Sequence, residues 1–115
     1  MAFSGGSDAF TLNIIHSALV SASEEMFMVT ARTAKSPIIY DVLDFSTAIT
    51  DREGNVTAQA ISCLVFVGVL DFTVKGVPKH YGKNGLRPDD VIILNDPYLS
   101  GTHLTDVAIV MPVFH

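Results

Sequence analysis

The spacing of hydrophobic residues predicts a long helix in the first third of the chain. Seven residues recur at alternating steps of three and four and form one stripe: Leu12, Ile15, Leu19, Ala22, Met26, Val29 and Thr33. Thr11 is the expected N-cap, and Arg32 and Lys35 suit the C-terminal end of the helix dipole. Pro37 is expected to end the helix, because the residue before a proline avoids helical geometry. Further apolar residues off the stripe predict packing on more than one side.

Beyond residue 38 the hydrophobic period changes from helical to alternating. Residues 45–50 and 56–60 are two short alternating runs on either side of residues 51–55. Gly54 lies in that connection and suits a left-handed turn position. This pattern predicts a β-hairpin.

The second half of the chain is expected to hold a helix and two strands. Residues 65–79 predict a helix, with Gly76 and Pro78 weakening its end. Its expected buried stripe is Val67, Leu70, Val74 and Val77. A loop over residues 81–88 leads to a wholly apolar run, residues 91–94, which predicts a fully buried strand.

A turn-rich loop, residues 95–105, then precedes a last strand over residues 107–114. The predicted fold class is therefore α+β: a long N-terminal helix, a β-hairpin, a second helix, and strands of a mixed or antiparallel sheet.

The composition excludes intrinsic disorder and contains an unusually high share of hydrophobic residues. Of 115 residues, 49% are hydrophobic and 17% are charged, and the mean hydropathy is +0.41. This number of charged residues is low for solvating the surface of a small acidic domain with so many hydrophobic residues. We therefore expect part of the surface to contact a partner or another part of a larger protein.

Charge and patterning also exclude several classes of partner. The net charge of −5 and the dispersed lysines and arginines argue against nucleic acid. The longest apolar run, residues 60–70, is too short for a membrane span, which needs about 20 apolar residues. No basic residue precedes Arg32, so a secretory signal is not expected, and the predicted location is the cytoplasm. Cys63 is the single cysteine and is expected to be a buried structural thiol.

The densest group of functional side chains lies in residues 95–106. His103 and Asp106 are three residues apart, and imidazole with carboxylate suits zinc, manganese or iron(II). Two ligands do not complete a metal site. The alternative is that Asp96 and Asp106 cap turns while His103 makes a local hydrogen bond, and the spacing alone favours this interpretation.

A second candidate is the pair Asp41 and Asp44, which lies among aliphatic residues. A buried carboxylate there would need a partner, because burying a lone charge is costly. The alternative, which the residues favour slightly, is two acids at a turn or strand edge facing water. The chain contains no glycine-rich phosphate loop, so it is not expected to bind a nucleotide by itself.

The segment "ILNDPYLSGTHLTDVAIVMPVF", residues 93–114, resembles the hydantoinase B/5-oxoprolinase family. This family includes B subunits of ATP-dependent N-methylhydantoinases and subunits of acetone and acetophenone carboxylases. Three earlier stretches resemble its N-terminal region in the same order: "ALVSASEEM", "RTAKSPIIYDVLDFSTAITDREGNVTAQ" and "LRPDDVIILNDPY". The small and polar residues at the start of the chain predict a flexible lead-in over residues 1–10. The resemblance implies that residues 11–115 are the incomplete N-terminal part of a hydantoinase B-like domain.

The resemblance also implies a divalent metal site for zinc, manganese or iron. His103 and Asp106 match the ligands of the family's Gly-Thr-His-x-x-Asp motif. Asp41 matches an acidic ligand of the carboxylase branch, although many relatives have Glu there. A further histidine ligand of the family is expected downstream of residue 115. Phe66 stands where many relatives carry a histidine, so no role of that histidine transfers to this chain.

The function that the resemblance implies is a share in metal-dependent, ATP-coupled hydrolysis of cyclic amides. The expected partner is a hydantoinase A-like subunit that binds ATP in a hetero-oligomer, and the 115-residue chain alone is expected to be inactive. One alternative is a subunit of an ATP-dependent ketone carboxylase. Another is a non-catalytic fragment or interaction module.

Overall fold

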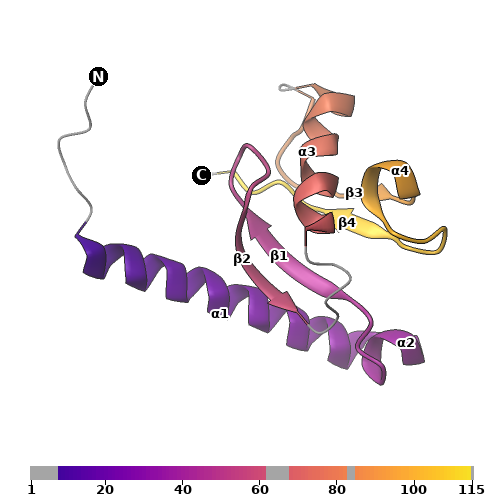
Figure 1. Cartoon of the computed structure of the whole chain (residues 1–115), viewed down its shortest axis with the longest axis horizontal. Helices are drawn as coiled ribbons and strands as arrows, with labels where there is room; N and C mark the ends of the chain where they lie inside the picture. Colours follow the sequence, from indigo (N-terminus) through magenta and orange to yellow (C-terminus); the bar gives the residue numbers. More distant parts are fainter. Residues whose placement is uncertain (1–7, 62–67, 83–84, 115) are drawn as a thin grey trace. The chain divides into compact units, whose positions relative to one another are not determined.

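The computed structural model describes residues 8–61, 68–82 and 85–114 (Figure 1). Its contacts divide the chain into two compact units: Met1–Ile49 with Thr57–Ser62, and Thr50–Val56 with Cys63–His115. The first unit holds helices α1 and α2 and most of a hairpin, and the second holds α3, α4 and a pair of strands. The predicted α+β class is confirmed.

The long helix α1 spans Ala9–Thr33. Its N-cap is Asp8, whose side chain accepts a hydrogen bond from the Phe10 amide at 3.4 Å, so the prediction of Thr11 as the cap is wrong. A carboxylate one residue before the helix can satisfy the first free amides, and the helix therefore begins earlier. α1 ends at Thr33, before Pro37 as expected, and Ser36, the residue before the proline, is extended. Pro37 itself opens the short helix α2, Pro37–Tyr40, where the missing amide of a first-turn proline costs nothing.

The side of α1 that packs is not the predicted apolar stripe. Ser23 is the one buried residue of α1, at 0% exposure, whereas Leu12, Ile15 and Val29 are exposed. The Ser23 hydroxyl donates to the Thr47 carbonyl at 3.1 Å, and the Thr47 hydroxyl donates to the Ser23 carbonyl at 2.8 Å. A small residue with reciprocal hydrogen bonds thus brings the helix close to the hairpin.

The predicted hairpin is confirmed, with β1 at Ser46–Thr50 and β2 at Val56–Ile61 (Figure 1). The Asp51 carboxylate caps its turn by accepting from the amides of Glu53 and Asn55 at 2.9 and 2.8 Å. Gly54 adopts φ +87°, and a Cβ there would lie 2.9 Å from Cγ of Lys75. Glycine is therefore required both by the left-handed backbone and by the neighbouring side chain.

The helix predicted over residues 65–79 is α3, Val69–Tyr81, which continues two residues past the predicted end. Val77 is buried at 2% exposure, as predicted, while Leu70 and Val74 are half-buried. Lys75 pairs with Asp71 one turn earlier at 2.7 Å, an arrangement that supports a helix. Val67, Cys63 and Phe66, named in the sequence predictions, lie outside the described residues.

Strand β3, Ile92–Leu94, pairs antiparallel with β4, Ala108–Val110. Ile93 lies opposite Ile109 on one face, and these side chains are 66% and 68% exposed. Ile92, on the other face, is 7% exposed. The prediction of a fully buried strand is therefore wrong, because a two-stranded antiparallel ribbon buries only the face that packs. The predicted last strand also shortens to three residues.

Among the helices that the structure describes, none combines the length and the apolar character of a membrane span.

Candidate functional site

The candidate site is the connection between β3 and β4, which contains the short helix α4, Pro97–Ser100. Asp96 caps α4 by accepting from the Tyr98 amide at 2.9 Å. The buried Ser100 hydroxyl donates to the Asp96 carbonyl at 3.0 Å. Asp96 therefore has the turn-capping role that the sequence offered as the alternative to metal binding.

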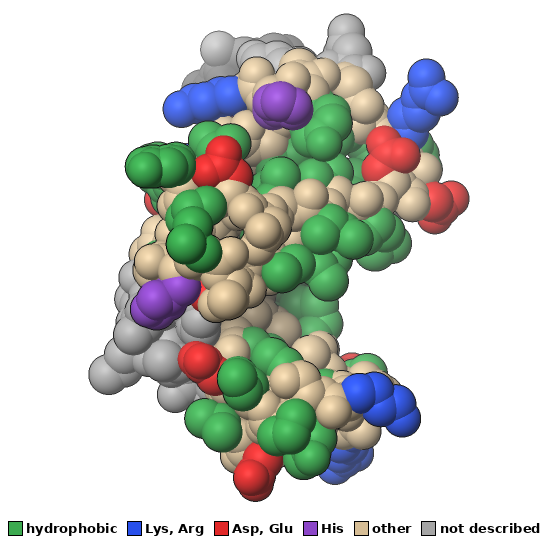
Figure 2. Space-filling view, turned by 90° about the vertical axis from the view of Figure 1, so that its right-hand side faces the viewer, with side chains coloured by type: hydrophobic (Ala, Val, Ile, Leu, Met, Phe, Trp, Pro, Cys, Tyr) green, Lys and Arg blue, Asp and Glu red, His purple; other side chains and the backbone are tan. Residues whose placement is uncertain are grey.

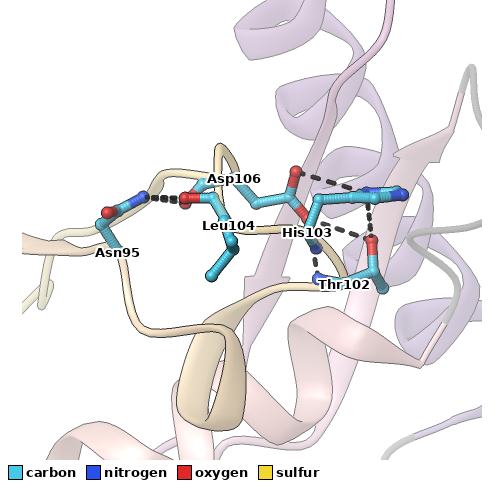
Figure 3. Close-up of polar contacts among 5 residues, drawn as sticks. All are labelled: Asn95, Thr102, His103, Leu104 and Asp106. Atoms are coloured by element: carbon cyan, nitrogen blue, oxygen red, sulfur yellow. Dashed lines mark hydrogen bonds and ion pairs between the residues drawn. The ribbon is translucent and has the colours of Figure 1, made fainter.

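Asn95 closes the base of this connection. Its side-chain amide donates to the carbonyls of Leu104 and Asp106, at 3.3 and 2.6 Å (Figure 3). These bonds tie the end of β3 to the chain just before β4. The segment between them is thereby held as a closed loop, and His103 and Asp106 both belong to it.

One carboxylate oxygen of Asp106 organises the loop from within. Oδ2 accepts three hydrogen bonds: from the Thr102 amide at 2.7 Å, the His103 amide at 2.9 Å and the Thr102 hydroxyl at 3.0 Å. Figure 3 shows Thr102 and His103 gathered beside this carboxylate. Asp106 therefore also fills the turn-capping role that the sequence offered as the alternative.

The same contacts keep Asp106 ionised. Burial acts to raise the pKa of Asp106, but the hydrogen bonds from Thr102 and His103 and the nearby imidazole lower it. The net result is a pKa below the ordinary value of 3.8. At neutral pH the loop thus carries a fixed negative charge, which is the form a metal ligand requires.

The structure brings His103 next to this carboxylate. Nδ1 of His103 lies 3.7 Å from Oδ1 of Asp106 and 3.0 Å from the Thr102 hydroxyl oxygen. The His103 side chain is 71% exposed, so its ring is accessible from solvent. The fold therefore brings the two predicted ligands close together, and the contact with Thr102 is the local hydrogen bond that the alternative assigned to His103.

Two residues of the motif have roles that sequence reasoning missed. A Cβ on Gly101 would lie 2.8 Å from Cβ of Asp106, so only glycine permits this close approach. Thr102 contacts both His103 and Asp106 through one hydroxyl. The signal was the Gly-Thr pair immediately before the histidine, which can be interpreted only when the loop geometry is known.

Asp41 lies in the first unit, as the C-terminal cap residue of α2. Its amide donates to the Pro37 carbonyl at 2.9 Å, and both Asp41 and Asp44 are exposed. His103 and Asp106 lie in the second unit, so a ligand set containing Asp41 stays a prediction. Within residues 8–61, 68–82 and 85–114, no three His, Cys, Asp or Glu side chains form a group that could hold a metal ion.

Comparison with known proteins gives several relatives over nearly the whole chain. An uncharacterized protein of Methanocaldococcus jannaschii is 40% identical over 94% of this chain and 20% of its own length. The 5-oxoprolinase 1 of Arabidopsis thaliana is 35% identical over 93% of this chain and 8% of its own length. The caprolactamase subunit beta of Pseudomonas jessenii is 30% identical over 94% of this chain and 18% of its own length.

The chain thus spans a fifth or less of the length of these relatives. No solved structure matches it. The model of the family described as hydantoinase B/oxoprolinase matches residues 8–115, which include the β3–β4 loop. The chain therefore belongs to the hydantoinase B/oxoprolinase family.

Proposed function

We propose that this chain is part of a metal-dependent, ATP-coupled hydrolase subunit that opens cyclic amides. Two relatives, by their names, act on 5-oxoproline and caprolactam, both of which carry the amide bond inside a ring. The observation that carries the proposal is the pairing of His103 with the ionised Asp106 inside the segment matched to the family.

The donor atoms of this pair fit a divalent metal. Imidazole nitrogen and carboxylate oxygen suit zinc, manganese and iron(II). Oδ2 of Asp106 is occupied by three hydrogen bonds, but among the described residues no group hydrogen-bonds to Oδ1 of Asp106 or Nε2 of His103. His103 and Asp106 therefore each keep a donor atom for an ion. Asp41 is proposed as a third ligand because it matches the acidic ligand of the family's carboxylase branch.

When bound, the metal would supply Lewis-acid polarisation of the amide carbonyl or activation of a water molecule. The residues of this chain would prepare the site for that chemistry. The amides of Thr102 and His103 hold Asp106 in one orientation. The exposed ring of His103 leaves the site open to a small substrate.

We propose that ATP is bound by a hydantoinase A-like partner in a hetero-oligomer. The name "subunit beta" of the caprolactamase relative supports assembly with another subunit. The ATP-binding role of that partner is proposed on the family resemblance.

The test is the metal content and activity of the complete gene product, co-expressed with its partner. We expect His103→Ala and Asp106→Ala to lose bound metal and ATP-dependent hydrolysis of 5-oxoproline or caprolactam, and Asp41→Ala to weaken both. Glu53→Ala, which changes an exposed acid in the hairpin turn, should retain both. Metal content that is unchanged in both His103→Ala and Asp106→Ala would refute the site.

A further inference from the structure

We propose that Thr102 is a positioning residue that holds the His103 imidazole in the Nδ1–H tautomer and so presents Nε2 as the ligand nitrogen. The part of this inference that concerns metal rests on the proposed function. The part that concerns the tautomer rests on the hydrogen bonds of the loop alone.

The Thr102 hydroxyl lies between two groups but has a single proton to donate. Its oxygen lies 3.0 Å from Oδ2 of Asp106 and 3.0 Å from Nδ1 of His103. A hydroxyl has one proton to donate, and an ionised carboxylate can only accept. The Thr102 proton therefore goes to Asp106, and the bond to His103 requires a proton on Nδ1.

The opposite arrangement is disfavoured by charge. If Thr102 donated to an unprotonated Nδ1, its oxygen lone pairs would face Oδ2 of Asp106 at 3.0 Å. Oδ1 of the same carboxylate lies 3.7 Å from Nδ1 and independently favours a proton there. Both carboxylate oxygens thus favour the same tautomer.

The consequence is a chain of hydrogen bonds from Nδ1–H of His103 through the Thr102 hydroxyl to Asp106 (Figure 3). A neutral imidazole with its proton on Nδ1 has its lone pair on Nε2. Metal-bound histidines commonly donate their other ring N–H to an orienting group, which fixes both tautomer and ring orientation. Here that orienting group would be a hydroxyl that also contacts the second predicted ligand, Asp106.

The direct test is the tautomer of His103 in the metal-free, complete gene product. Long-range proton–nitrogen NMR correlations distinguish the two tautomers at pH about 8, above the ordinary pKa of histidine. The His103 signals are assigned by their loss in His103→Asn. We expect Nδ1–H in the natural protein and in Thr102→Ser, and loss of that preference in Thr102→Val. A natural protein with the proton on Nε2, or a Thr102→Val variant with an unchanged tautomer, would overturn the inference.

The second measurement is zinc affinity by calorimetry on the same proteins. Thr102→Val is expected to bind Zn²⁺ about 10–100-fold more weakly, the usual effect of losing an orienting partner, and Thr102→Ser to restore binding. Circular dichroism controls for folding. If Thr102→Val changes the tautomer while His103→Asn leaves zinc binding intact, the positioning role of Thr102 stands and the proposed metal function fails. If the tautomer changes in Thr102→Val but zinc affinity does not, the link between tautomer and ligation is refuted.

Discussion

At the scale of single residues, the Gly-Thr-His-x-x-Asp motif is a set of contacts around one carboxylate. Gly101 allows the chain to pass close to Asp106. The backbone amides of Thr102 and His103 donate hydrogen bonds to the Asp106 carboxylate. Asn95 binds the Asp106 carbonyl from the other end of the loop. Gly101 contributes the absence of a side chain, and Thr102 contributes a hydroxyl. His103 contributes an imidazole, and Asp106 is the acceptor.

Gly101→Ala is expected to disturb the loop without unfolding the protein. The added Cβ would lie 2.8 Å from Cβ and 3.2 Å from Oδ2 of Asp106, so the carboxylate must move. We expect at least tenfold weaker zinc binding by calorimetry, comparable to the loss of an orienting partner.

Gly76→Ala is the matched control for this substitution. Gly76 lies inside α3, and an added Cβ there would meet only the Leu99 carbonyl oxygen at 3.8 Å, an ordinary contact. Alanine is favoured over glycine in a helix by about 1 kcal/mol, so the variant should melt at the same or a higher temperature. Equal zinc affinity in Gly101→Ala and the natural protein would contradict the role of Gly101.

Asp51 should make the hairpin turn sensitive to acid. Hydrogen bonds from the Asn55 side chain and amide and from neighbouring amides outweigh desolvation and lower the pKa of Asp51 below 3.8. Because the folded pKa is the lower one, the stabilisation is fully present above the unfolded value and is lost as pH falls through the folded value. Carboxyl NMR titration should give a value below 3.8 in the folded protein. A matching titration of Asn55→Ala should move that value upward, and an unchanged value would contradict the assignment.

At the scale of elements, α1 meets the hairpin through a few close contacts rather than a broad apolar stripe. The rings of Phe27 and Phe45 stack with centroids 4.3 Å apart and an interplanar angle of 10°. The reciprocal bonds of Ser23 and Thr47 lie one turn away along the helix. A serine at the closest approach lets the two backbones come together while its hydroxyl stays satisfied.

Phe27→Ala is therefore expected to destabilise the protein more than the same change at its neighbour. Truncating a fully buried phenylalanine costs about 3–5 kcal/mol, and we expect about 2 kcal/mol for the half-buried Phe27. Met28→Ala, at an exposed position of the same helix, should have a small effect. Melting temperatures of both variants by calorimetry provide the comparison, and equal losses would show that the ring stack does not stabilise this unit.

At the scale of the whole molecule, many of the hydrophobic side chains of the described residues are exposed on the surface. In Figure 2, hydrophobic side chains are spread over the visible face with charged side chains between them, and many large apolar residues of the described chain are exposed. On the β3–β4 pair, the outward face carries Ile93 and Ile109 directly opposite each other. Exposed apolar patches of this kind mark surfaces that associate or that other protein segments cover.

We therefore expect the 115-residue chain, produced alone, to self-associate as its concentration rises. Burial of exposed apolar side chains drives such association, so sedimentation should show a rising average mass. Ile93→Thr, at an exposed strand position, is expected to reduce the association without lowering the melting temperature. A chain that stays monomeric at all concentrations would contradict the interpretation of this surface.

Local chemistry made much of the fold predictable. The long helix, the hairpin with Gly54 at its left-handed turn position, and the second helix follow from periodicity and turn residues. The ends were less predictable, because Asp8 displaced Thr11 as the cap and Pro37 opened a new helix. At the site, the sequence placed His103 and Asp106 in one loop, but the spacing alone favoured turn capping, and their assignment as metal ligands came from the family resemblance. The contact of the Thr102 hydroxyl with both side chains was not predictable, because the Gly-Thr pair before the histidine can be interpreted only when the loop geometry is known.

Local sequence patterns were enough to predict the class of fold, the position of the hairpin and the loop that carries the candidate ligands. Each depends on interactions between residues close along the chain, whose geometry is restricted by the backbone. These patterns did not predict which faces are buried, which depends on packing between elements: Ser23 is buried rather than the α1 stripe, and Ile92 is buried but Ile93 is not. Burial depends on what packs against a face, and apolar periodicity cannot distinguish a face covered within these residues from one left open.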